Sequence, residues 1–361
     1  MKSSSALRVS ASSSALHFDL PDALKIAILP FLVSRLLLGL AAGLAYVSIG
    51  FARPGDPQHP WPLAPWLSWD AVHYLRIARA GYPPDPTSSD LGFFPLLPLL
   101  LGAAGASEWA AVALGFVLGL AGFAVLAALT ARVWDRQAAV RVCWLAAFWP
   151  LAIFWSAVYT EGLFLALAAG ALWSAWAGGA LPAAALGLAA GLLRPNGLML
   201  ALPLLVLLPA GWARLAALGP LPGPALFATY LWAHTGRPLG FLASQAGHHP
   251  LAVGHPFGRL LTLDPVEVLG FGFLLLAVAA AVWLATRPEL GAWRVAAPVT
   301  IGALLLPSLA SGSLASFGRY SMAAFPIYWA LQRVPTRLLV LAVAPTTLAC
   351  TVLTATGRLT P

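Results

Sequence analysis

The stretch SWDAVHYLRIARAGY, residues 68–82, places polar and charged side chains between very apolar neighbours. The segment 68–80 is expected to form a short helix at the membrane surface, seated in the interface by Trp69, Tyr74 and Ile77. At helical spacing Asp70, His73, Tyr74 and Ile77 share one face. A carboxylate at a membrane surface can serve as a general base toward a hydroxyl group. The structural alternative is an interfacial helix that Ser68 caps, with Asp70 in its first turn and aromatic residues in the membrane interface. Spacing alone leaves both interpretations open.

Two arginines stand beside residues that break helices, Arg194 in LLRPNGL and Arg319 in FGRYSMAAFP. Fixed cations can stabilise negative charge that develops in a transition state, without a metal ion. The alternative for both is an arginine at a helix end that extends to lipid head groups. Asn196 either bonds a polar ligand or caps the next half-helix. Arg35 lies within an apolar segment, so we expect it to need a structural partner or a lipid contact.

Tyr159 and Glu161 stand where the chain turns between two apolar segments, so they either shape a pocket or belong to an ordinary turn. Three histidines superficially resemble a metal cluster, but no carboxylate or cysteine accompanies them at ligand spacing. These are His248, His249 and His255. We therefore expect no metal ion. No nucleotide-sugar or P-loop motif is present, and the glycine-rich segment 162–191 indicates helix packing.

The composition defines the kind of protein that must position these residues. The chain is 60% hydrophobic and 9% charged, and apolar segments recur along it. Segments of about 20 residues suffice to cross roughly 30 Å of hydrocarbon at about 1.5 Å per residue. The formal charge of +8 is scattered, which indicates topology signals and no nucleic-acid partner. The sequence therefore predicts an all-α polytopic membrane protein.

Two further compositional features bear on origin and redox chemistry. Arginine outnumbers lysine 18 to 2, and Asn196 is the only asparagine, which we interpret as a high-GC bacterial genome. Cys143 and Cys350 lie far apart in apolar segments, so no disulfide framework is indicated.

The predicted organisation is one transmembrane domain, residues 21–361, after a disordered cytoplasmic N-terminus, residues 1–20. The first helix, about 22–50, is retained rather than cleaved. Two long external loops are expected at 51–92 and 234–263, and the segment 93–106 is interfacial or re-entrant. Further spans are expected at about 108–131, 138–157, 160–177, 180–193, 197–210, 213–233, 264–286, 293–311, 319–333 and 338–356. The pair 180–193 and 197–210 could instead form one kinked span. The total is about eleven.

Charge distribution predicts the orientation, with the N-terminus in the cytoplasm. The basic residues then expected inside are Arg132, Arg136, Arg141, Arg214, Arg287, Arg294, Arg333 and Arg337. The acids expected outside are Asp56, Asp70, Asp85, Asp90, Glu108, Glu161, Asp264 and Glu267. The first loop, the break at Arg194 and Arg319 then converge on the external face, where we expect a polar site.

WDAVHYLRIARAGY followed by FFPLLP resembles the signature of the PIG-V-like mannosyltransferases, with this chain a bacterial member. Further matching segments follow in the expected order: SAVYTEGLFLAL (156–167), LLRPNGL (192–198), RPLGFLASQAGHH (237–249) and GRYSMAAFPIYWAL (318–331). The chain departs from the family at Pro195, where serine is usual, and at Gly162, where serine is common.

The resemblance implies a GT-C glycosyltransferase fold, with short interfacial helices in the first external loop. It implies transfer of mannose from a polyprenyl-phosphate mannose donor to a lipid- or glycan-linked acceptor, with inversion and without a cofactor. Asp70 would be the catalytic base. The donor phosphate and sugar would be bound by Arg194, Asn196, Arg319 and Tyr320. Possible substrate contacts are Trp69, His73, Tyr159, Glu161, Gln245 and His248. The protein would lie in the cell membrane with its active site outside.

Two other functions remain open. The same fold could transfer another polyprenyl-phosphate-linked sugar. A lipid or solute transporter would instead place charged groups near the midplane, in broken helices of two inverted repeats. No clear internal repeat is found and the charged groups gather at one rim, which favours the transferase.

Overall fold

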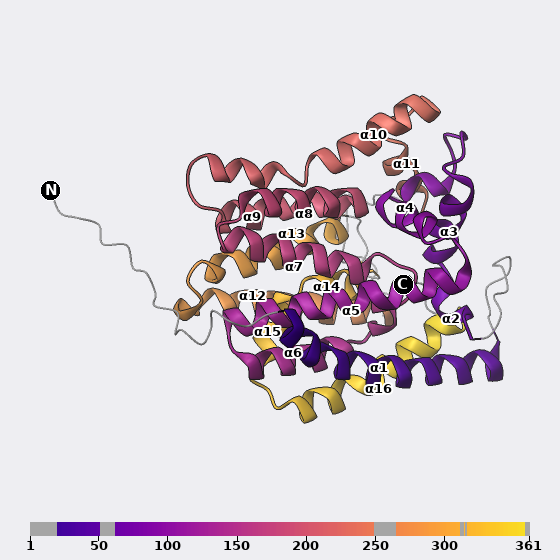
Figure 1. The fold of residues 1–361 in the computed structure, drawn as a ribbon. Helices are drawn as coiled ribbons and strands as arrows, with labels where there is room; N and C mark the ends of the chain where they lie inside the picture. Colours follow the sequence, from indigo (N-terminus) through magenta and orange to yellow (C-terminus); the bar gives the residue numbers. More distant parts are fainter. Residues whose placement is uncertain (1–19, 51–61, 249–264, 311–313, 315, 358–361) are drawn as a thin grey trace.

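The computed structural model describes residues 20–50, 62–248, 265–310, 314 and 316–357, with the backbone alone at 245–248, 265 and 310. Every regular element in these ranges is helical (Figure 1). The first eight α-helices are α1 (Leu20–Ile49), α2 (Ala64–Leu67), α3 (Asp70–Ala80), α4 (Leu96–Ala103), α5 (Glu108–Val133), α6 (Arg136–Ala147), α7 (Glu161–Trp176) and α8 (Ala180–Leu193). They are followed by α9 (Ala201–Leu207), α10 (Pro222–Thr235), α11 (Gly240–His248), α12 (Pro265–Ala285), α13 (Trp293–Ala310), α14 (Phe317–Ala323), α15 (Pro326–Leu331) and α16 (Thr336–Ala355). Short 3₁₀ helices are η2 (Ser89–Gly92), η3 (Ala152–Trp155), η4 (Pro195–Leu200), η5 (Trp212–Leu218) and η7 (Pro288–Leu290).

Among the described residues, four helices are long and apolar enough to cross a membrane, namely α1, α5, α12 and α16. Four shorter apolar helical segments accompany them, namely Glu161–Trp176, Ala180–Leu193, Pro195–Leu207 and Trp293–Leu309. The prediction of an all-α multispan membrane protein is therefore confirmed, whereas the count of about eleven spans stays a prediction.

Several expected spans are interrupted because proline and glycine end their helices early. In the segment 138–157, α6 ends at Ala147 and the chain turns through η3. The segment 319–333 is divided into α14 and α15, with Pro326 starting the second helix. The segments 180–193 and 197–210 are separate elements rather than one kinked span. A Cβ atom on Gly197 would lie 2.2 Å from the carbonyl oxygen of Ala190, so the chain folds back on α8.

Glycines bring α5 very close to the turn that leads into α7. A Cβ atom on Gly119 would lie 2.1 Å from the carbonyl oxygen of Trp155. One on Gly162 would lie 2.7 Å from the Cα atom of Gly119. Small residues at a helix interface allow backbones to approach in this way. This packing fixes the turn that carries Tyr159 and Glu161.

The short helices of the first loop gather at one end of the helix bundle, on the right in Figure 1. There α3 packs on α4, and α11 packs on η2. The Ser244 hydroxyl donates to the carbonyl oxygen of Ser89 at 2.9 Å, which joins α11 to η2. The expected short helix over 68–80 is confirmed as α3.

Two details of that expectation are wrong. Ser68 does not cap α3, because its hydroxyl donates to the carbonyl oxygen of Ala64 at 2.8 Å and Trp69 occupies the N-cap position. Trp69, Tyr74 and Ile77 do not lie in the lipid interface either. They are buried inside the protein, where α3 is covered by α2 and α4.

Candidate active site

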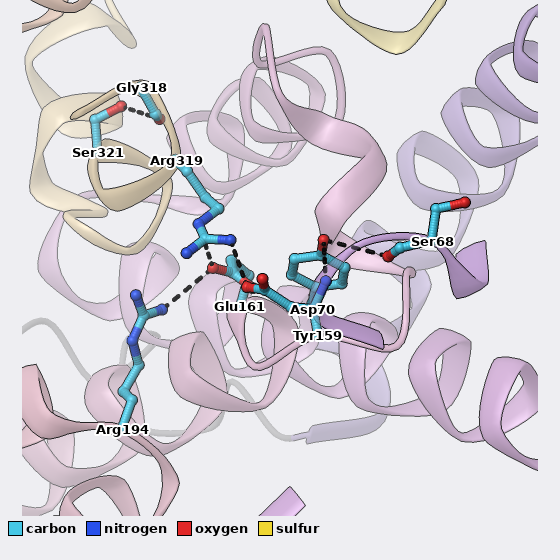
Figure 2. Close-up of polar contacts among 8 residues, drawn as sticks. All are labelled: Ser68, Asp70, Tyr159, Glu161, Arg194, Gly318, Arg319 and Ser321. Atoms are coloured by element: carbon cyan, nitrogen blue, oxygen red, sulfur yellow. Dashed lines mark hydrogen bonds and ion pairs between the residues drawn. The ribbon is translucent and has the colours of Figure 1, made fainter. Parts of the chain in front are cut away.

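Four charged side chains form a continuous row at the start of α3 (Figure 2). The Arg319 Nη1 atom donates to Asp70 Oδ2 at 2.8 Å. The Arg319 Nε atom lies 3.5 Å from Glu161 Oε1. Arg194 Nη1 donates to the same glutamate oxygen at 3.3 Å. Two carboxylates thus alternate with two guanidinium groups, and their formal charges cancel.

Exposure increases from Glu161 toward Asp70. The side chain of Glu161 is 1% exposed, that of Arg194 8%, that of Arg319 14% and that of Asp70 30%. A buried charge needs a partner to offset its desolvation. Glu161 supplies that partner for both arginines, and Asp70 presents the most accessible group of the row.

The backbone immediately before Asp70 is strained. Trp69 has φ 64° and ψ −124°, a conformation that a residue with a side chain rarely adopts. The Trp69 indole Nε1 donates to the carbonyl oxygen of Thr354 in α16 at 3.3 Å. Strain of this kind persists only where the surrounding structure imposes it, and it is typical of functional sites.

The Tyr159 hydroxyl binds this strained segment on both sides. It accepts a hydrogen bond from the Asp70 backbone N–H at 3.1 Å and donates to the Ser68 carbonyl oxygen at 3.4 Å. Burial raises the pKa of Tyr159 well above its ordinary value, with the Asp70 charge acting in the same direction. The phenol therefore remains protonated and keeps its donor.

The arginines are held by aromatic faces as well as by carboxylates. Arg194 is extended, with φ −163° and ψ 151°, because Pro195 follows it. Its guanidinium carbon lies 5.1 Å from the Phe164 ring centroid and 5.0 Å from that of Tyr320. The guanidinium carbon of Arg319 lies 5.9 Å from the same Tyr320 ring. Neither arginine extends to lipid head groups, so that alternative is wrong.

His73 does not join the row, although it lies one helical turn from Asp70. Its Nδ1 atom is 2.6 Å from Asp90 Oδ1, and its ring stacks on Phe93 at 4.4 Å. Arg76 Nε lies 3.7 Å from the other Asp90 oxygen. The sequence analysis named Asp90 only as an external acid, and its contact with His73 beside the row was not predicted. The one signal in the sequence was an acid three positions before the apolar FFPLLP segment.

The remaining predicted residues are less informative. Asn196 is buried, and within the described residues its Oδ1 atom accepts no hydrogen bond. The side chains of Gln245 and His248 lie outside the described residues, as do His249 and His255. In the described part of the chain no three His, Cys, Asp or Glu side chains are grouped as metal ligands.

Arg35 has partners within the protein, which was one of the two possibilities that the sequence left open; the other was a lipid contact. The buried guanidinium donates to the carbonyl oxygens of Ala147, at 3.1 Å, and of Ala152. It also lies 3.3 Å from the Ser156 hydroxyl. Arg35 thereby holds the turn that leads toward Tyr159.

Residues 61–206 match the family model described as Mannosyltransferase (PIG-V). The matched segment contains Asp70, Tyr159, Glu161, Arg194 and Asn196, and it confirms the family resemblance over that part of the chain. No curated protein sequence matches the chain.

Among solved structures, the chain is similar to the Archaeoglobus fulgidus oligosaccharyltransferase in complex with Zn and sulfate, with a TM-score of 0.47 and 15% identity. The similarity covers 90% of this chain and 53% of that one, so this chain spans about half its length.

Proposed function

We propose, from the premise that residues 61–206 belong to the mannosyltransferase (PIG-V) family, that this protein transfers a mannosyl residue from polyprenyl-phosphate mannose. The acceptor is a hydroxyl group of a lipid- or glycan-linked molecule, and the anomeric centre is inverted. No cofactor takes part. The observation that carries the proposal is the row of Asp70, Arg319, Glu161 and Arg194 inside a membrane protein.

Asp70 is the base of the proposed reaction. The acceptor oxygen attacks the anomeric carbon, and the bond from that carbon to the phosphate oxygen breaks. The bonding electron pair stays on the phosphate, and the proton of the acceptor hydroxyl goes to Asp70. Asp70 is suited to this role because it is the most exposed acid of the row and is held from its backbone.

Arg319 is proposed to pair first with Asp70 and then with the leaving phosphate. Before reaction its guanidinium is paired with the Asp70 carboxylate at 2.8 Å. Once Asp70 takes a proton it loses its charge, and at the same moment the phosphate gains one. The Arg319 charge can then turn from the acid to the leaving phosphate. Glu161 keeps hold of Arg319 and Arg194 during this exchange.

The proposal places this site on the external face of the cell membrane, in a GT-C architecture with the N-terminus in the cytoplasm. The distribution of acidic and basic residues supports this orientation. The short helices α2 and α3 in the first loop support the architecture. About eleven spans, several of them short or broken, would complete it.

Transfer of label tests the proposal. Membranes containing the protein are supplied with radiolabelled polyprenyl-phosphate mannose, and the labelled products are identified. We expect mannose on a lipid- or glycan-linked product, absent from membranes without the protein. The same assay with the glucose-carrying donor tests the alternative sugar. Movement of intact donor across the membrane, without any transfer, would support the transporter instead.

A further inference from the structure

Tyr159 occupies a position where a substrate contact would be expected, yet its geometry points elsewhere. The residue is only 5% exposed. Its hydroxyl accepts from the Asp70 backbone N–H and donates to the Ser68 carbonyl oxygen, so its donor and one acceptor position are used within the protein. A sugar hydroxyl would have to displace one of these bonds. Tyr159 therefore acts on the protein rather than on the substrate.

The two bonds span Trp69, whose backbone conformation is strained. Among the described residues, only Trp69 and Ala106 combine a side chain with a positive φ. Trp69 lies between the two backbone groups that Tyr159 holds. We call these two hydrogen bonds of the Tyr159 hydroxyl the clamp. Without the clamp, residues 68–70 would relax toward ordinary backbone conformations. The start of α3 would then rotate, and the Asp70 carboxylate would move with it.

The clamp also connects Asp70 to its ion partner. The Arg319 guanidinium carbon lies 5.7 Å from the Tyr159 ring centroid while its Nη1 atom bonds Asp70. The ring of Tyr159 thus supports the cation, and the hydroxyl fixes the backbone of the acid. These are separate contributions, and a phenylalanine would remove only the second.

We propose that Tyr159 is a positioning residue: its hydroxyl holds the strained Trp69–Asp70 backbone and so aims the Asp70 carboxylate at the acceptor hydroxyl. The inference rests on the proposed function, because it gives Asp70 a reaction to perform. A misplacement of about 1 Å at a reacting group can cost about 10²-fold in rate. The clamp should therefore affect turnover much more than binding.

The test compares two tyrosine-to-phenylalanine variants in the full-length protein. Tyr159→Phe removes the clamp and keeps the ring. Tyr328→Phe is the matched control, since Tyr328 is also buried and its hydroxyl donates to a backbone carbonyl, that of Met322 at 2.9 Å. Both variants lose a buried hydroxyl, so both should lower Tm by a similar amount. Only Tyr159→Phe should lower kcat, by about 10- to 100-fold, with the donor KM nearly unchanged.

A second comparison separates positioning from general damage. In an Asp70→Asn background, Tyr159→Phe should cause no further loss of the residual rate, because the group it aims is already gone. A multiplicative loss in that background would overturn the inference. So would equal kcat values for Tyr159→Phe and Tyr328→Phe. Failure of the wild-type protein to transfer mannose would instead contradict the proposed function itself.

Discussion

Asp70 depends on residues far from it in the sequence. Arg319 is 249 positions away and Tyr159 is 89 positions away, yet both bond Asp70 directly. Asp70 and Tyr159 lie within the residues that match the family model, whereas Arg319 lies beyond them. All three were candidates from the sequence because of their residue types and of the motifs that contain them. The pairing of Asp70 with Arg319 was not predictable, because helical spacing relates only near neighbours. The strain at Trp69 left no trace in the sequence, since tryptophan is not a residue that favours positive φ.

Arg319→Ala should impair both reaction and stability. The change leaves Asp70 without its cation and removes one of the two cations that partner the buried Glu161. If Arg319 also binds the leaving phosphate, loss of this charge-assisted bond should cost about 2–3 kcal/mol in kcat/KM. Arg319→Lys should retain only part of the wild-type kcat/KM, because an ammonium group cannot bond two partners in the planar geometry of a guanidinium group.

The measurement is kcat/KM for the donor in each Arg319 variant, with protein amount and Tm recorded in parallel. Arg76→Ala is a useful control, since Arg76 is half exposed and lies 3.7 Å from Asp90 rather than in the row. Full activity in Arg319→Ala would show that the arginine takes no part in the reaction.

At the scale of elements, apolar runs predicted most helix bounds within a few residues, but not the places where a helix is interrupted. The segments 180–193 and 108–131 correspond closely to α8 and α5. The segments 138–157 and 319–333 do not, because the chain turns after Ala147 and breaks before Pro326. Hydrophobicity favours the membrane without specifying a continuous helix. Proline and close packing then decide how each segment is divided.

The contact between α5 and the start of α7 explains why glycine occupies position 162. The resemblance led us to expect serine at position 162, but here any Cβ atom would lie 2.7 Å from the Cα atom of Gly119. We therefore expect Gly162→Ser to destabilise the protein by about 1–3 kcal/mol through overpacking. Loss of activity should follow from displacement of Glu161.

Thermal unfolding in detergent measures this effect. Gly302→Ala is the matched control, because a Cβ atom there would meet nothing within 4 Å. The control should leave Tm unchanged or raise it slightly, since alanine is favoured over glycine in a helix. A Gly162→Ser protein as stable as Gly302→Ala would contradict the close-packing argument.

At the scale of the whole molecule, the site is electrically balanced within a poorly charged protein. The formal charges of two acids and two arginines cancel in the row. In the proposed reaction, protonation of Asp70 would therefore leave the row with one net positive charge facing the leaving phosphate. The class of protein followed directly from composition, because only 9% of the residues are charged. The neutrality of the row could not be predicted from composition, because it depends on how α3, α7, α8 and α14 pack together.

Transfer should not require a divalent metal ion. The charge that develops on the phosphate can be met by Arg319, with Arg194 nearby. We expect transfer rates in EDTA to equal those in untreated membranes. Complete loss of transfer in EDTA, restored by Mn²⁺ or Mg²⁺ alone, would contradict this prediction.

The most direct test of the account is Asp70→Asn, assayed for mannose transfer and for binding of the product polyprenyl phosphate. The amide keeps the shape of the side chain but removes both the base and the charge that occupies Arg319. Turnover should fall by about 10²–10⁴-fold. The anionic product should bind more tightly, by about tenfold, because the Arg319 charge is released to it. Near-normal turnover in Asp70→Asn would contradict the account and return Asp70 to a structural role at the start of α3.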